Sequence, residues 1–294
     1  MKFANEIAAT AYRVLNKCAQ EMDSAGPWRW RCVMQNGTRM NIAAAMDDGF
    51  LQLVCHPDAI RKSALALEDA ILCNKTLAGG VKLALNISSS GLHLRTDIVI
   101  VEEQQLHDRL EWALEGFHDG NRLLLSSDVL NERARPQTAP DADLDEQLRE
   151  SSWSCTKRGP NNYSVELDAQ AAPPAGIRIN GSNLELSVEL LRCGEPANAS
   201  RHALALFLLT ATSALRMVRA YAARAEDQES YGLQVSLPSS AASAEIDHAL
   251  AALSIAYRMC AREAAVLLKD AAAVHYLAAR DQSTTDNHQT EKEN

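Results

Sequence analysis

Apolar positions along the chain change from helical to alternating spacing in an order that occurs twice. Residues 3–22 place apolar side chains on one face at helical spacing, which predicts an amphipathic helix that ends at Ser24, Gly26 and Pro27. Three runs that alternate apolar and polar residues follow and predict strands, at residues 28–34, 39–46 and 50–55. Asn-Gly and Asp-Gly pairs separate these runs and favour tight hairpin turns, so the three strands are expected to form an antiparallel meander.

The rest of the first half repeats the change of spacing in a shorter form. Apolar residues at helical intervals predict a helix over residues 57–77, which the pair Gly79-Gly80 ends. Two strands and a closing amphipathic helix follow, at residues 81–85, 91–101 and 106–117.

The second half carries a similar series with two departures. The Trp-Ser-Cys tripeptide at residues 153–155 opens it, as Trp-Arg-Cys at residues 30–32 opens the first meander. Its first helix is confined to residues 143–150, and a Pro-rich insertion at 171–176 separates its second and third strands. Two helices and a strand pair complete it, at residues 198–215, 218–222, 232–235 and 243–276.

The sequence therefore predicts an α+β fold with two tandem copies of one module, in the order helix, three-stranded antiparallel meander, helix, two strands, helix. The expected boundaries are residues 1–133 for the first module, 134–144 for a linker and 145–280 for the second module. Residues 281–294 are polar and predict a disordered tail. Because the linker is short, we expect the two modules to superpose and to pack as a monomer with internal pseudo-twofold symmetry.

Charge and composition restrict the choice of partner. The 294-residue chain has a formal net charge of -9 and a pI near 5.4, without a Lys/Arg stripe, so nucleic acid is not an expected partner. No apolar run approaches the ~20 residues that span a bilayer. The N-terminus also lacks a charged region followed by a continuous apolar one. We therefore expect a cytoplasmic protein without membrane insertion.

Seven cysteines, none of them in a Cys-x-x-Cys pair, predict reduced thiols at small core positions. Cys55 precedes His56, but adjacent residues of a strand point to opposite faces, so the two are not expected to form a thiol–imidazole pair. The histidines on predicted helices lack the His-x-x-x-His spacing of a metal site. No catalytic residue, cofactor or metal is therefore predicted. The alternative is a cysteine-dependent enzyme or metal-binding protein that combines Cys55 with a distant histidine.

Trp28, Trp30 and Trp153 are the candidate binding residues. Trp30 and Trp153 occupy similar places in the repeat, and the simpler interpretation is that each ring packs beneath the helices of its own module. The alternative is that one or both line an apolar groove between sheet and helix in which a partner peptide docks. Trp28 shares the strand face of Trp30 without a counterpart in the second half, which is compatible with an exposed aromatic residue in a binding surface.

The order of elements, the acidity and the glycine that leads the last strand of each half, Gly91 and Gly232, resemble the class I type III secretion chaperones. This Tir-chaperone-like family consists of small acidic bacterial proteins, and the resemblance covers residues 3–130 and 143–278 and extends to YbjN-like proteins. Its members form homodimers around which an unfolded segment of a secreted protein wraps, without catalysis. Because those members are single modules, the resemblance implies a covalent pseudo-dimer in this chain.

The expected function is that of a non-enzymatic, secretion-chaperone-like module that binds a segment of a client protein through apolar grooves. Such binding has to offset the ordering of the client, so a continuous apolar patch has to be exposed in the free protein. Two alternatives stay open at this point, the cysteine-dependent enzyme or metal-binding protein and a structural scaffold.

Overall fold

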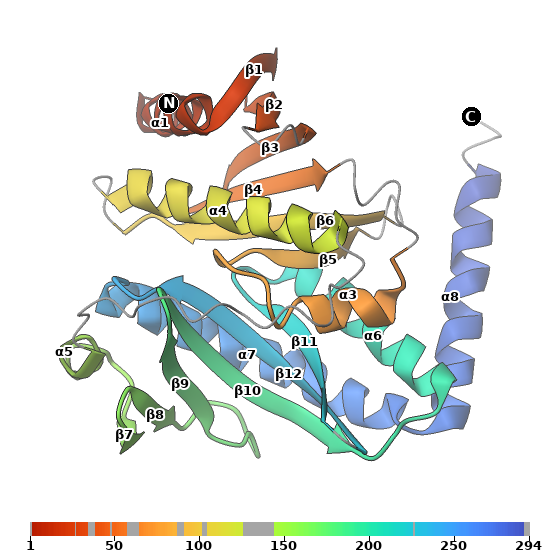
Figure 1. Ribbon diagram of the computed structural model, residues 1–294. Coiled ribbons are helices and arrows are strands. Elements are labelled where there is room, and N and C mark those ends of the chain that lie inside the picture. The colour runs from red at the N-terminus through yellow and green to blue at the C-terminus, as the bar shows by residue number, and fades with distance from the viewer. Residues whose placement is uncertain are drawn as a thin grey trace.

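The computed structural model contains two antiparallel six-stranded sheets with helices packed against them (Figure 1). The predicted α+β class is confirmed. The structure describes residues 2–26, 28–34, 39–47, 49–57, 65–86, 91–101, 105–125, 144–225 and 227–290.

The first sheet contains the predicted meander with one more strand at its edge, in the order β1-β2-β3-β4-β6-β5. Its strands are β1 (Ala19–Gly26), β2 (Arg29–Met34), β3 (Arg39–Asp47), β4 (Phe50–Pro57), β5 (Lys82–Asn86) and β6 (Gly91–Val99). The helices of this half are α1 (Lys2–Cys18), α3 (Leu67–Cys73) and α4 (Leu106–Leu125). α1 packs against α4 and β1, and α4 packs against β6.

The added strand β1 corrects the predicted end of the first helix. α1 stops at Cys18, and the residues up to Met22 that were expected to continue it belong to β1. Met22 is the one large apolar residue of this strand and fits either spacing, so periodicity alone favoured the helix. In the fold it lies opposite Cys32, and pairing with β2 gives the backbone of this segment its hydrogen-bond partners.

The second sheet has the order β7-β8-β9-β10-β12-β11. Its strands are β7 (Cys155–Gly159), β8 (Asn162–Val165), β9 (Ala175–Asn180), β10 (Asn183–Cys193), β11 (Arg219–Ala225) and β12 (Gln228–Pro238). The helices of this half are α5 (Leu144–Arg149), α6 (Asn198–Ala214), α7 (Ser243–Leu267) and α8 (Asp270–Thr290). α7 packs on β10 and β12, while α8 packs on α6 and α7.

The two sheets share one strand order when each is followed along the chain, which supports the predicted duplication. The meander has four strands in each half, however, and not the predicted three. In the second half the additional turn lies between β9 and β10 at Gly181, whose φ of 62° is a conformation that glycine adopts without strain.

Strand order shows which strands are equivalent in the two sheets. β2, which carries Trp30, and β8, which carries Tyr163, are each the second strand from the meander edge. The counterpart of β2 is therefore β8. Trp153 precedes β7, the edge strand, so the predicted equivalence of Trp30 and Trp153 is wrong. The similar tripeptides at residues 30–32 and 153–155 suggested this equivalence. In the structure the first lies in the second strand of its sheet and the second leads into the first strand, so the two differ by one strand.

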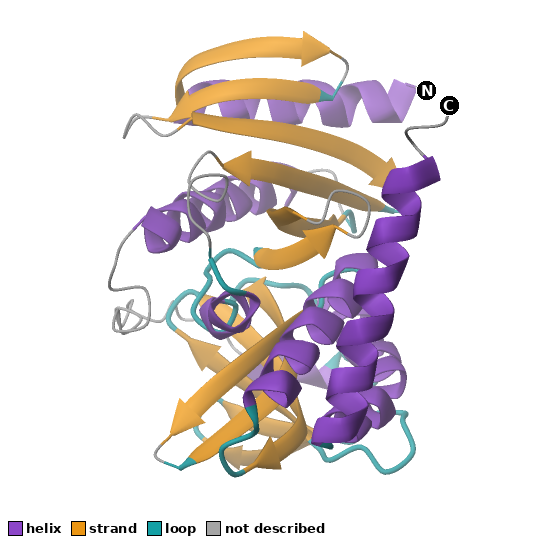
Figure 2. Ribbon diagram, turned by 90° about the vertical axis from the view of Figure 1, so that its right-hand side faces the viewer, coloured by secondary structure: helices purple, strands orange, loops and turns teal. Residues whose placement is uncertain are grey.

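Several predicted segments have different limits in the structure. The single helix expected over residues 243–276 is divided at Leu268 and Lys269 into α7 and α8. α8 continues to Thr290, so residues 281–290 are helical where a disordered tail was predicted. Figure 2 shows α8 rising from α7 toward the end of the molecule at which α1 lies. The predicted linker, except Leu144 at its end, and the start of the helix predicted over residues 57–77 lie outside the described residues.

Two glycines bring α4 close to the chain that leads into β5. A Cβ atom on Gly79 would lie 2.6 Å from the Cα of Gly116, so neither position accommodates a larger residue without movement. Gly79 has a φ of 66°, but the predicted helix end at this glycine is wrong: α3 ends at Cys73 with Asn74 as its C-cap, and Gly79 lies in the turn before β5. This close approach fixes α4 against the chain segment that enters the interface between the two halves.

Candidate functional site

Among the described residues, several buried charged side chains lie where the two halves meet, along the edge strands β5 and β11. α6 of the second half packs on β5, and α3 of the first half packs on β11 and on α6. The contacts are thus reciprocal, as they are in an interface between two copies of one protein. We call this interface the seam.

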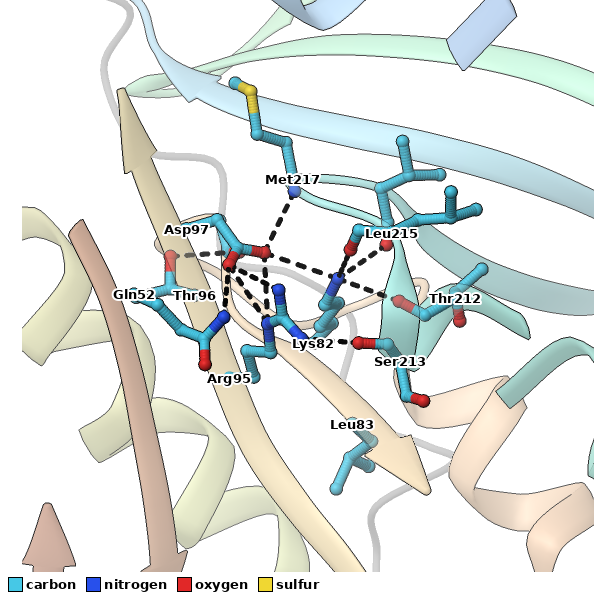
Figure 3. A network of polar contacts seen from close by, with 12 residues as sticks. Gln52, Lys82, Leu83, Arg95, Thr96, Asp97, Thr212, Ser213, Leu215 and Met217 are labelled. Carbon is cyan, nitrogen blue, oxygen red and sulfur yellow. Dashed lines mark hydrogen bonds and ion pairs between the residues drawn. The ribbon is translucent and has the colours of Figure 1, made fainter. Parts of the chain in front are cut away.

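Lys82 of β5 is the buried cation at one end of the seam. Its side chain is 1 % exposed, and its ammonium group donates to the carbonyl oxygens of Thr212, Leu215 and Val218 at 2.5–3.0 Å (Figure 3). These carbonyls belong to the end of α6 and the segment before β11. Each ammonium proton has an acceptor from the other half, which fastens this segment to the first sheet.

Asp97 and Arg95 of β6 complete the network around Lys82. Asp97 lies 3.4 Å from the Lys82 ammonium, accepts hydrogen bonds from Arg95, and accepts one from the backbone N–H of Met217 at 3.0 Å. Arg95 also donates to the carbonyl of Ser213. Figure 3 shows these groups converging from β5, β6 and the segment that follows α6.

Burial and charge act in opposite directions on this network. Burial would raise the pKa of Asp97, but the positive charges of Lys82 and Arg95 together with hydrogen bonds outweigh it and lower that pKa. Burial lowers the pKa of Lys82 to about 8, against the opposing effect of Asp97. Lys82 is therefore still mostly charged at neutral pH, and each proton of its ammonium group is engaged in a hydrogen bond to a carbonyl. A lysine held in this way has no free lone pair for nucleophilic catalysis.

Arg219 of β11 occupies the reciprocal position in the seam. Its guanidinium donates to the carbonyls of Leu77 and Val81, in the segment before β5, at 2.6 and 3.0 Å. It also donates to the Ser236 hydroxyl at 2.8 Å. Asn74 adds a further bond across the seam, to the carbonyl of Ala220 at 2.9 Å. A buried cation of each half thus binds carbonyls at the start of the other half's equivalent strand.

The hairpin tips and the closing helices extend the reciprocal contacts. Phe50, at the start of β4, packs edge-on against His248 of α7 with ring centroids 6.1 Å apart. Asn183, at the start of β10, accepts a hydrogen bond from the indole N–H of Trp112 on α4 at 3.1 Å. Arg109 of α4 forms a buried, bidentate ion pair with Glu245 of α7 at 2.7–2.8 Å. The seam therefore joins strands, hairpin tips and helices of both halves.

Six thiols do not have the properties of nucleophiles. Burial raises the pKa of Cys32, Cys55, Cys73, Cys155, Cys193 and Cys260, to about 11 for Cys32 and to about 12 for Cys73. Cys55 is fully buried in the core, and its pKa is raised by that burial. The thiolate is the reactive form of cysteine, and burial disfavours it at each of these positions.

Within the described part of the chain, His107, Asp108 and Glu111 form one group whose ligand atoms lie within 4.8 Å of one another. The group is on the surface of α4, with His107 and Asp108 exposed. Glu111 already accepts a hydrogen bond from Lys17 at 2.7 Å. An exposed cluster of this kind is common on helix surfaces, and the lysine ammonium competes for one of its carboxylates.

The three candidate tryptophans lie in different surroundings. Trp30 is 5 % exposed and belongs to the core, which matches the simpler interpretation of this residue. Trp28 is half-buried between β1 and β2 with a φ of 60°, and its carbonyl accepts a hydrogen bond from the N–H of Ala44. Trp153 is half-buried before β7 in the other sheet. The structure does not bring the three together into one groove.

Large apolar side chains that are exposed in the described residues occur chiefly on the last two helices. These are Ile255, Met259 and Val266 of α7 and Val274 of α8, in addition to Tyr12 of α1 and Val101. Sequence reasoning did not single out any of them. The sequence does contain a pattern that could have indicated them, because apolar residues of the helical stretch after residue 243 extend beyond one face.

Comparison of the chain with protein-family models, with curated proteins and with solved structures finds no match. Among the described residues, no helix has the length and apolar character needed to cross a membrane.

Proposed function

We propose that the chain is a non-enzymatic, cytoplasmic protein-binding module, a monomeric pseudo-dimer that holds a segment of a client protein. One contrast carries the proposal. The buried charges of the seam are committed to contacts between the two halves, whereas large apolar side chains are exposed on α7. Exposed apolar surface of this kind is typical of protein interaction sites.

The reciprocal seam also supports the pseudo-dimer. Single modules of the secretion-chaperone-like class act as dimers, and here two similar halves face each other within one chain. The edge strands β1 and β7 are departures from the three-stranded meander on which that resemblance rests. The net charge of -9 argues for a protein client and against nucleic acid.

Co-expression with the proteins encoded beside its gene tests this function. We expect one of them to co-elute with the chain in size-exclusion chromatography at a fixed ratio, and a segment of that protein to be sufficient. A partner that binds only as a folded domain would favour the structural scaffold. If no neighbour co-elutes, and the purified chain holds stoichiometric zinc or a thiol that reacts rapidly at neutral pH, the cysteine-dependent enzyme or metal-binding protein replaces this proposal.

A further inference from the structure

One face of α7 exposes three large apolar side chains. Ile255, Met259 and Val266 are 46 %, 52 % and 40 % exposed. Their spacing of four and seven residues places them along one side of the helix over three turns. Ala251 and Ala265 are exposed on the same stretch and are small enough to let another element approach closely.

The equivalent helix of the first half shows that this exposure is not a requirement of the fold. The buried residues Leu106, Leu110 and Phe117 of α4 match the buried residues Ile246, Leu250 and Tyr257 of α7 at one constant spacing. That spacing assigns acids of α4 to two of the three apolar residues of α7, Ile255 and Met259.

Two positions make the difference explicit. Glu115, which is exposed on α4, corresponds to Ile255, and Asp119, which is half-exposed, corresponds to Met259. The second half therefore has apolar side chains where the first half has the carboxylates of an ordinary solvated surface. Water favours the carboxylates, so the apolar residues indicate a surface that is covered in the working state.

The charges beside the apolar residues indicate what covers it. Arg258 and Arg262 are exposed on this part of α7, and within the described residues no acid forms an ion pair with either of them. Glu263 is the only acid between residues 251 and 266 of the helix. The surface is thus apolar with a positive border, on a chain whose net charge is -9.

We propose that this surface, the α7 face, binds an amphipathic helix that carries acidic residues beside its apolar stripe. The α7 face comprises Ala251, Ile255, Arg258, Met259, Arg262 and Val266. The inference rests on the proposed function, because it identifies the client segment as such a helix. A helix face has no free backbone groups to pair with a strand, so recognition depends on interlocking side chains and on charge. The two arginines favour a partner with carboxylates and disfavour a basic one.

Two synthetic peptides test the proposal. One is a helical peptide with leucines at positions i, i+4, i+7 and i+11 flanked by glutamates, and the other is the same peptide with every glutamate replaced by lysine. We expect the acidic peptide to bind at least about tenfold more tightly by isothermal titration calorimetry. The Met259→Glu variant is expected to lose this binding about tenfold or more. Arg262→Glu should remove the preference for the acidic peptide.

Tyr12→Glu is the matched control, since Tyr12 is also a large, half-exposed apolar residue on a helix but lies on α1 of the other half. Equal losses from Tyr12→Glu and Met259→Glu, or equal binding of the two peptides, would overturn the proposal. If Met259→Glu still binds the co-eluting client, the α7 face is wrong while the proposed function stands. If the chain self-associates in a concentration-dependent way and Arg262→Glu abolishes this, the α7 face binds the acidic α4 of a second copy of the chain. That outcome would exclude a client helix as the occupant.

Discussion

The seam has one end at Lys82 of β5 and another at Arg219 of β11, and at each end a buried cation donates to backbone carbonyls of the other half. The charged groups beside the two cations differ. Lys82 lies opposite Arg95 in the β5–β6 ladder, whereas Arg219 lies opposite the neutral Gln234 in the β11–β12 ladder. Two cations opposite each other on neighbouring strands repel, and Asp97 forms an ion pair with each of them, at 3.4 Å from Lys82 and 2.7 Å from Arg95. The described hydrogen bonds of Arg219 go to carbonyls and a hydroxyl and not to a carboxylate, although the charge of the buried Glu185 acts on this arginine.

This difference shows which part of the seam the geometry requires. A buried donor group that reaches the carbonyls of the other half is present at both ends. A carboxylate in a direct ion pair is present only at Lys82, where a second cation adjoins it, whereas Glu185 acts on Arg219 without such a pair among the described contacts. Variants at the two ends can therefore separate the effect of the donor from that of the counter-charge.

Replacing Lys82 by methionine is expected to have the largest effect. Lys82→Met leaves three carbonyls of the α6–β11 segment without their donor and removes one of the two cations that compensate the buried Asp97. Removing one partner of a buried ion pair costs about 3–5 kcal/mol of unfolding free energy. Urea denaturation measures this, with Lys17→Met as the control, because the Lys17–Glu111 pair is exposed and is worth about 0–1 kcal/mol. Similar losses in the two variants would contradict a structural role for the seam.

Arg219→Met is expected to destabilise the chain less. The substitution leaves the carbonyls of Leu77 and Val81 without this donor, but it removes no hydrogen bond from a carboxylate. An unsatisfied buried polar group costs about 1–3 kcal/mol, so we expect about 2 kcal/mol in the same denaturation experiment. A loss larger than that of Lys82→Met would show that the counter-charge is not what distinguishes the two ends.

A smaller change in unfolding free energy, which depends on pH only in the acidic range, should distinguish the end of the seam that contains Asp97. The pKa of Asp97 is lowered in the folded chain, so its contribution to stability is present above its usual pKa of 3.8. That contribution is lost as the pH falls through the lower, folded-state value. The difference in unfolding free energy between wild type and Asp97→Asn should therefore be constant near neutral pH and decrease on acidification. A difference that is independent of pH down to about 2 would exclude the ionised carboxylate as the stabilising group.

The sequence predicted the parts of the fold that depend on local periodicity. Most of the strands and helices of the two halves were located from alternating or helical spacing, because half-buried elements reveal themselves through their buried face. The edge strand β1 was missed, since its one large apolar residue, Met22, is compatible with either element. The alignment of Trp153 with Trp30 failed for a related reason, because strand pairing is a long-range property that two tripeptides do not determine.

The seam was less accessible to prediction than the fold. Lys82 and Arg219 each stand as the single cation near the start of an apolar strand that follows a helix, in both halves. A repeated cation at one place in a buried strand is a signal that could have been used, since such a residue requires a partner. Its acceptors are backbone carbonyls more than a hundred residues away in the sequence, so no side-chain pattern reveals them.

The smallest expected effect on stability concerns the α4 and α7 surfaces. Ile255→Glu and Met259→Glu give α7 the kind of residue that Glu115 and Asp119 provide on α4. Exposed substitutions between good helix formers change stability within about 0.5 kcal/mol, so the double variant should unfold at nearly the same urea concentration as wild type. Ala256→Glu, on the buried side of the same helix, is the control that should destabilise the chain strongly. If the exposed double variant lost more than about 1 kcal/mol, the α7 face would already be covered within the chain, and its apolar residues would serve packing and not an external helix.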